Sequence, residues 1–176
     1  NGTLNKVLEK ARKKASEKLK DWHFSMKKSS PEEYCKIQYN RFKKIGNYKY
    51  TTLRGENVRN YLEKEVADLL FNQNLDYKYE PCIKIGEKCV FPDFALGNLV
   101  IESTAWKGPD KAIKLKEKIG FLEQLGFEVI VIVPFELNHF YLPIKANIKT
   151  VSELESYLIA RVAQTKPGPL LLLLTS

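Results

Sequence analysis

The chain has 176 residues, of which 44% are hydrophobic and 28% charged, and its formal net charge is +8. One hydrophobic core usually serves about 100 to 200 residues, so this length fits one or two small domains, and the composition excludes a disordered chain or a fibre. The notable apolar run, Leu170–Leu174, falls far short of the roughly 20 residues that cross a bilayer. The first 25 residues lack the apolar segment of a signal peptide. We therefore expect an intracellular, cytoplasmic protein without a membrane partner.

The positive charge is concentrated at the N-terminus. Residues 1–50 hold 14 Lys and Arg against 5 Asp and Glu, whereas residues 51–176 hold 15 against 16. A basic arm in front of a near-neutral body favours a polyanionic partner, and nucleic acid is commoner than an acidic membrane surface. The alternative is a lysine-rich helix whose charges simply face solvent.

The three cysteines do not form a zinc site. Cys35, Cys82 and Cys89 include no CxxC pair, and the two histidines do not complete a ligand set. Cys82 and Cys89 can face each other across a hairpin that turns at residues 86–88. In a reducing compartment, two buried small hydrophobic side chains are favoured there over a disulfide.

Three helices are predicted in the first half of the chain. Apolar residues recur every three or four positions from Leu4 to about Trp22, which indicates an amphipathic helix. A second helix should begin at Pro31, with Ser30 as its N-cap, and end at Gly46. Its aromatic and basic residues can bind nucleic acid, although aromatics on a helix more often pack inward. The third helix is predicted from about residue 56 to 73.

The second half alternates strands with helices. Short β-branched or aromatic segments at 77–85, 89–96 and 99–101 predict three consecutive strands, and 127–133 predicts a strand covered on both faces. Helices are predicted at 108–125 and from 151 to about 163. This order argues for an α/β fold with a mixed sheet flanked by helices. We assign residues 1–50 to a basic helical arm, 51–150 to the core, and 151–176 to a C-terminal helix with a leucine-rich tail.

Two carboxylates are expected side by side at one end of this sheet. Pro92-Asp93 lies in the second strand, and Glu102 ends the third strand after a Gly97-Asn98 turn. An Asp in an apolar strand is costly unless its charge is compensated, and a hard divalent cation such as Mg²⁺ does this with oxygen ligands. The alternative is that both acids mark strand ends on a solvated rim.

This pattern resembles the PD-(D/E)xK nuclease superfamily, which includes restriction and some homing endonucleases and Holliday-junction resolvases. Upstream, Arg54-Gly55, Glu63 and Tyr79-Glu80-Pro81 are similar in order and spacing to archaeal Holliday-junction resolvases. The resemblance covers roughly residues 53–135 and implies a restriction-endonuclease-like core. It implies Mg²⁺, with Mn²⁺ as a substitute, held by Asp93, Glu102 and the carbonyl of Ser103, and Glu63 as an additional catalytic acid.

The chain departs from the superfamily at the lysine two residues after the glutamate, where Thr104 stands. The lysine positions or activates water and offsets negative charge, which a hydroxyl does less well. Lys107 and Lys111 are our candidates to replace it. The competing account is that Lys111, Lys114 and Lys118 share one helical face and contact phosphate or solvent. If no lysine reaches the acids, the fold serves binding alone.

The sequence therefore predicts a Mg²⁺-dependent endodeoxyribonuclease, of homing, restriction or junction-resolving type, that acts on duplex or branched DNA as a homodimer. The alternatives are a catalytically weak or inactive DNA-binding subunit and an RNA-processing nuclease. His139 is interpreted as a packed rim residue rather than a general base. Glu80 is interpreted as an exposed strand-end residue, and the alternative is that it faces the metal site. The predicted nucleic-acid contacts are Lys13, Lys14, Arg41, Lys43, Lys44, Arg54, Arg59 and Trp106.

Overall fold

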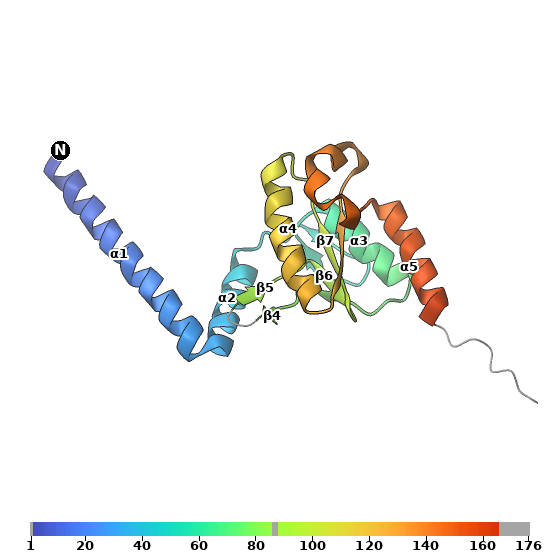
Figure 1. The fold of residues 1–176 in the computed structure, drawn as a ribbon, viewed down its shortest axis with the longest axis horizontal. Helices are drawn as coiled ribbons and strands as arrows, with labels where there is room; N and C mark the ends of the chain where they lie inside the picture. Colours follow the sequence, from blue (N-terminus) through green and yellow to red (C-terminus); the bar gives the residue numbers. More distant parts are fainter. Residues whose placement is uncertain (1, 86–87, 166–176) are drawn as a thin grey trace, which may run out of the picture. The chain divides into compact units, whose positions relative to one another are not determined.

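The computed structural model describes residues 2–85 and 88–165, which divide into two compact units (Figure 1). The first unit joins the N-terminal residues up to Gly46 with the hairpin residues 82–91. The second unit contains the rest of the described chain. The predicted leucine-rich tail and the turn at residues 86–87 lie outside the described residues.

Two helices and a hairpin form the first unit. Helix α1 spans Gly2–Ser29, and α2 spans Pro31–Ile45, with Pro31 in its first turn as predicted. Ser30 precedes α2 but makes no side-chain cap hydrogen bond. Helix α2 contacts the antiparallel hairpin of β4 (Ile83–Ile85) and β5 (Lys88–Val90).

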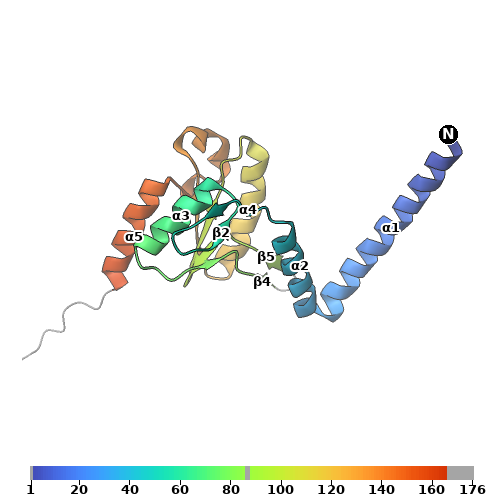
Figure 2. The ribbon, with the colours of Figure 1, turned by 180° about the vertical axis from the view of Figure 1, so that it is seen from behind.

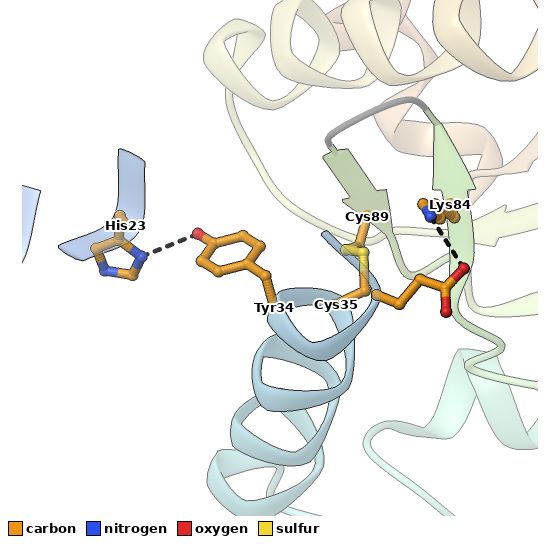
Figure 3. Close-up of a disulfide and its surroundings, with 6 residues drawn as sticks. His23, Tyr34, Cys35, Lys84 and Cys89 are labelled. Carbon is orange, nitrogen blue, oxygen red and sulfur yellow. Dashed lines mark hydrogen bonds and ion pairs between the residues drawn. A yellow bond between two sulfur atoms is a disulfide. The ribbon is translucent and has the colours of Figure 1, made fainter. Parts of the chain in front are cut away.

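The cysteine prediction is wrong. Cys89 on β5 forms a disulfide with Cys35 on α2 (Figure 3), and Cys82 is an exposed free thiol. The reason is the hairpin register, which pairs Cys89 with Lys84 and therefore not with Cys82. The sequence contained no signal that α2 would lie against this hairpin.

A five-stranded mixed sheet forms the centre of the second unit, in the order β3-β6-β7-β8-β9. The pairs β3–β6 and β6–β7 are antiparallel, whereas β7–β8 and β8–β9 are parallel. The strands span Lys78–Tyr79 (β3), Phe94–Leu96 (β6), Leu99–Ser103 (β7), Glu128–Ile132 (β8) and Ile148–Lys149 (β9). A short separate pair, β1 (Tyr50–Thr51) and β2 (Asn57–Val58), precedes this sheet in the chain.

Helices cover both faces of this sheet, which confirms the α/β prediction. Figures 1 and 2 show α3 (Tyr61–Asn72) and α5 (Val151–Thr165) on one face and α4 (Pro109–Gln124) on the other. On the α3 and α5 face, a core packs Val66, Leu70, Leu99, Ile101, Ile130, Ile132, Leu154 and Leu158. Burying these aliphatic side chains supplies the main favourable free energy of folding, at about 25 cal/mol per Å² of apolar surface.

The predicted boundaries hold best where Pro or Gly marks them. Helix α4 begins at Pro109 and strand β8 follows Gly126 closely, as expected. Helix α3 instead begins at Tyr61, because residues 57–58 pair as β2. Strand β9 and the run of 3₁₀ turns η1 (Phe135–Asn147) were not predicted from the sequence. Among the described helices, none is both long and apolar enough to cross a membrane.

Candidate active site

Asp93 lies immediately before β6 and is held by the end of β7. Its Oδ2 accepts hydrogen bonds from the backbone N–H and the hydroxyl of Ser103, at 2.7 and 2.8 Å. The pairing of Phe94 with Ile101 brings these two strand ends together. Burial raises the pKa of Asp93, while the nearby Lys118 and the Ser103 hydrogen bonds act in the opposite direction. Within the described residues, Oδ1 of Asp93 accepts no hydrogen bond.

Glu102 is the second acid, and it lies on β7 with 6% of its surface exposed. Burial raises its pKa to about 7, and the negative charge of Asp93 adds to the rise. Lys118 opposes both effects through an ion pair of 2.5 Å between its Nζ and the Oε1 of Glu102. The structure therefore brings Asp93 and Glu102 together as predicted, and the solvated-rim alternative fails because Glu102 is buried.

The ammonium group at this acid pair belongs to Lys118, not to either favoured lysine. Lys118 lies in α4, and the spacing of seven residues puts it on the same helical face as Lys111. Lys111 is exposed, but its charge also lowers the pKa of Glu102, by less than the charge of Lys118 does. Lys107 is exposed, and no contact with either acid is found for it in the described structure.

Glu63 lies at the start of α3, where its carboxylate completes a helix cap. The backbone N–H of Glu63 donates to the Asn60 side chain, and the Asn60 amide donates back to Oε1 of Glu63 at 2.5 Å. The backbone N–H of Arg59 and the hydroxyl of Tyr79 donate to Oε2, at 2.9 and 2.6 Å. Burial raises the pKa of Glu63, and the charge of Asp93 raises it further. Glu63 thus lies within electrostatic reach of Asp93, yet its oxygens are occupied by structural contacts.

Glu80 is buried rather than exposed, so the prediction of an exposed strand-end residue is wrong. Only 1% of its surface is accessible, and its Oε1 pairs with the Nε of Arg59 at 2.5 Å. The Tyr48 hydroxyl donates to its Oε2 at 2.7 Å. The charge of Glu80 contributes to the raised pKa values of both Glu63 and Asp93. The sequence did not indicate Tyr48, and it indicated Tyr79 only through the resemblance, because a tyrosine in or near a strand gives no signal of an acidic partner.

The Thr104 side chain makes a hydrogen-bond contact with η1. Its side chain is buried and lies 3.0 Å from the Tyr141 hydroxyl, which donates to the backbone carbonyl of Trp106 at 2.8 Å. Thr104 therefore ties β7 to η1. Trp106, in the loop after β7, is 66% exposed, so its side chain is accessible to a ligand.

The predicted nucleic-acid contacts fall into two groups. Lys13, Lys14, Arg41 and Lys44 are exposed on α1 and α2, and Lys43 lies over the Tyr39 ring. The two arginines predicted to contact nucleic acid in the second unit are already engaged in internal contacts. Arg54 donates to the carbonyl of Tyr77 and pairs with Glu56, and Arg59 pairs with Glu80.

The described residues contain no group of three or more His, Cys, Asp or Glu side chains placed to hold a metal ion. The candidate site is instead an acid pair beside a lysine, with two further buried acids nearby. Comparison of the chain with family models, with curated proteins and with solved structures finds no match.

Proposed function

We propose that the second unit is a metal-dependent endonuclease core that hydrolyses phosphodiester bonds in DNA. The observation that carries this proposal is the pair of adjacent carboxylates, the buried Glu102 and the half-buried Asp93, with the Lys118 ammonium bound to Glu102. Burying two acids together is unfavourable unless a cation offsets them. The order helix, antiparallel strands, helix and parallel strand around this pair supports the resemblance to PD-(D/E)xK nucleases.

The donor set fits a Mg²⁺ ion. Mg²⁺ keeps several waters and is usually held in proteins by one or two carboxylates, so a third acidic ligand is not required. Asp93 through Oδ1, Glu102 and the carbonyl of Ser103 would hold it. When bound, such an ion polarises the scissile phosphodiester and lowers the pKa of the attacking water.

In this proposal Lys118 replaces the catalytic lysine of the superfamily, because Thr104 stands at the position where that lysine would be. Its ammonium group lies against Glu102, where it can hold the attacking water and offset negative charge that develops on the phosphate. Thr104 cannot do so while its hydroxyl lies against Tyr141.

The basic helices provide the affinity for DNA. Phosphate contacts position a protein on a duplex without reading the sequence, and exposed lysines and arginines on α1 and α2 are suited to that role. Because the acid pair would repel phosphates without a cation, binding and cleavage would depend on different parts of the chain.

A second copy of the chain is the expected partner, since cutting both strands of a duplex takes two sites. Helix α1 offers the surface, because one apolar stripe includes five exposed large side chains: Leu4, Val7, Leu8, Leu19 and Trp22. We expect sedimentation velocity to show a dimer that Leu8→Glu with Leu19→Glu converts to a monomer. Lys6→Glu with Lys20→Glu is the matched control, and a monomeric parent would contradict the expectation.

Cleavage of supercoiled plasmid in Mg²⁺ tests the function. We expect nicking by the parent and a loss of about 100-fold or more in both Asp93→Ala and Glu102→Ala, because each removes a ligand and its charge. Glu117→Ala, an exposed acid on α4, should cleave like the parent. Cleavage that persists in both site variants would refute the site.

The second candidate is a DNA-binding subunit without catalysis. The structure gives it one specific support, because Thr104 at the superfamily's lysine position is committed to the contact with Tyr141. Tight DNA binding by the parent without cleavage in Mg²⁺ or Mn²⁺ would favour this candidate. Parallel reactions with junction, linear duplex and RNA substrates would separate the remaining roles.

A further inference from the structure

One face of the β4–β5 hairpin lies against one face of α2. Lys84 pairs with Glu32 at 3.5 Å, and Cys89 is bonded to Cys35 (Figure 3). Phe91 stacks on Phe42 with ring centroids 4.8 Å apart. The three α2 residues are spaced by three and seven positions, as residues on one helical face are. Lys84 and Cys89 are direct cross-strand partners, and Phe91 follows Cys89 by two residues, so all three side chains share one side of the hairpin.

Cys82 belongs to that same side. It precedes Ile83, the first residue of β4, and lies two residues before Lys84, so strand alternation directs it as Lys84 is directed. In the register that pairs Lys84 with Cys89, Cys82 is the diagonal neighbour of Cys89. Diagonal neighbours on one face of an antiparallel pair lie about 7–8 Å apart. A disulfide spans at most about 7 Å between Cα atoms, so a shift of about 1 Å suffices to join them.

We propose that Cys82, Cys89 and Cys35 form an intramolecular thiol–disulfide exchange site. The thiolate of Cys82 attacks Sγ of Cys89, a new Cys82–Cys89 bond forms, and the Cys35–Cys89 bond breaks. The electron pair of the broken bond leaves on Cys35, which takes up the proton that Cys82 lost. The exchange conserves one disulfide and one thiol and therefore needs no external oxidant or reductant.

The exchange would release α2 from its covalent attachment to the hairpin. The contacts that remain include the rings of Tyr39 and Phe42 against Phe91 and the exposed Lys84–Glu32 ion pair, and exposed ion pairs stabilise little. Helix α2 carries the exposed Arg41 and Lys44. Whether Cys89 is bonded to Cys35 or to Cys82 would therefore determine whether the helix that carries these cations is covalently attached to the hairpin. The inference concerns the first unit alone and does not depend on the nuclease site.

Mapping the free thiol tests the exchange directly. The oxidised parent is incubated at pH 8, quenched in acid, labelled with N-ethylmaleimide and digested for peptide mass spectrometry. We expect part of the label to move from Cys82 to Cys35. In Cys82→Ser, no thiol should become labelled, because Cys35 and Cys89 stay bonded. Label that remains wholly on Cys82 in the parent would overturn the proposal.

The variant Cys35→Ser isolates the second bond. After equilibration with glutathione disulfide, we expect Cys82 and Cys89 to form an intramolecular disulfide, which mass spectrometry detects as the loss of two hydrogens. Two free thiols, or glutathione on either cysteine, would overturn the proposal. Trypsin should cut this oxidised variant at Arg41 about tenfold faster than it cuts Cys82→Ser, because α2 is then untethered. Circular dichroism of both variants verifies that the chain is folded, and equal cutting rates would show that the bond does not hold α2.

Discussion

Lys118 forms an ion pair with Glu102 at the candidate site. We expect Lys118→Met to lower plasmid nicking about 100-fold, because it removes the ammonium group that faces the acid pair. Lys114→Met removes an exposed lysine of the same helix and should have little effect. Initial rates at saturating Mg²⁺, compared at equal helical content, measure both. Full activity of Lys118→Met would exclude Lys118 as the replacement for the missing lysine.

Glu102 also makes the stability of the metal-free protein depend on pH. Its pKa is about 7 in the folded chain, against an ordinary value of 4.5, so between these values the folded protein keeps a proton that the unfolded chain has lost. The free energy of unfolding should therefore fall as the pH rises from about 4.5 to 7, by on the order of 1–3 kcal/mol. Urea unfolding in EDTA across this range measures the slope.

Glu102→Gln isolates this contribution, because the amide does not titrate. We expect a shallower fall in the variant than in the parent, while the raised pKa values of Asp93 and Glu63 leave part of the fall in both. Equal slopes would show that the folded-state pKa of Glu102 is not raised.

The N-terminus of α3 explains why Glu63 is difficult to assign from sequence. Asn60 and Glu63 are spaced by three residues, which is the pattern of a capping box, and this signal was available in the sequence. The apolar residue Val58 fitted the helical period and moved the predicted start to about residue 56. In the structure the pairing of β2 takes precedence, and Asn60 caps the helix.

We expect Asn60→Ala to lower the free energy of unfolding by about 1 kcal/mol, because it removes the cap of α3. Glu63→Gln retains a hydrogen-bond acceptor on the side chain. If Glu63 only supports the local structure and does not bind the metal ion, this variant should lower plasmid nicking less than tenfold. Urea unfolding and the plasmid assay measure the two effects. A loss in Glu63→Gln as large as that in Asp93→Ala would return Glu63 to the set of catalytic acids.

Elements bounded by Pro or Gly, or carrying a long apolar period, were predictable from the sequence. Helix α2 and helix α4 begin at Pro31 and Pro109, and β8 is a continuous apolar run. Strand β9 was not predictable, because two residues give no period. Nor could the sequence identify Lys118 as the lysine that pairs with Glu102. Lys111, Lys114 and Lys118 share one face of α4, and only the packing of α4 on the sheet determines which of them reaches the acid.

Across the whole molecule, the excess positive charge lies in the helices that precede the acid pair. We expect combined neutralisation of Lys13, Lys14, Lys43 and Lys44 to glutamine to weaken binding to all duplex sequences alike. Each lost phosphate contact should reduce the slope of log affinity against log salt by about 0.9, because fewer counterions are released. Fluorescence anisotropy with two unrelated duplexes from 50 to 200 mM salt measures the slope.

The matched control removes the same charge from the second unit, at the exposed lysines Lys49, Lys78, Lys116 and Lys145. If the basic helices hold the DNA, this control lowers the slope much less than the first set does, although both variants lose four charges. Equal effects would mean that net charge alone attracts DNA. An unchanged slope in the first set would assign α1 and α2 to folding or self-association, and the exposed apolar stripe of α1 would then be their principal functional surface.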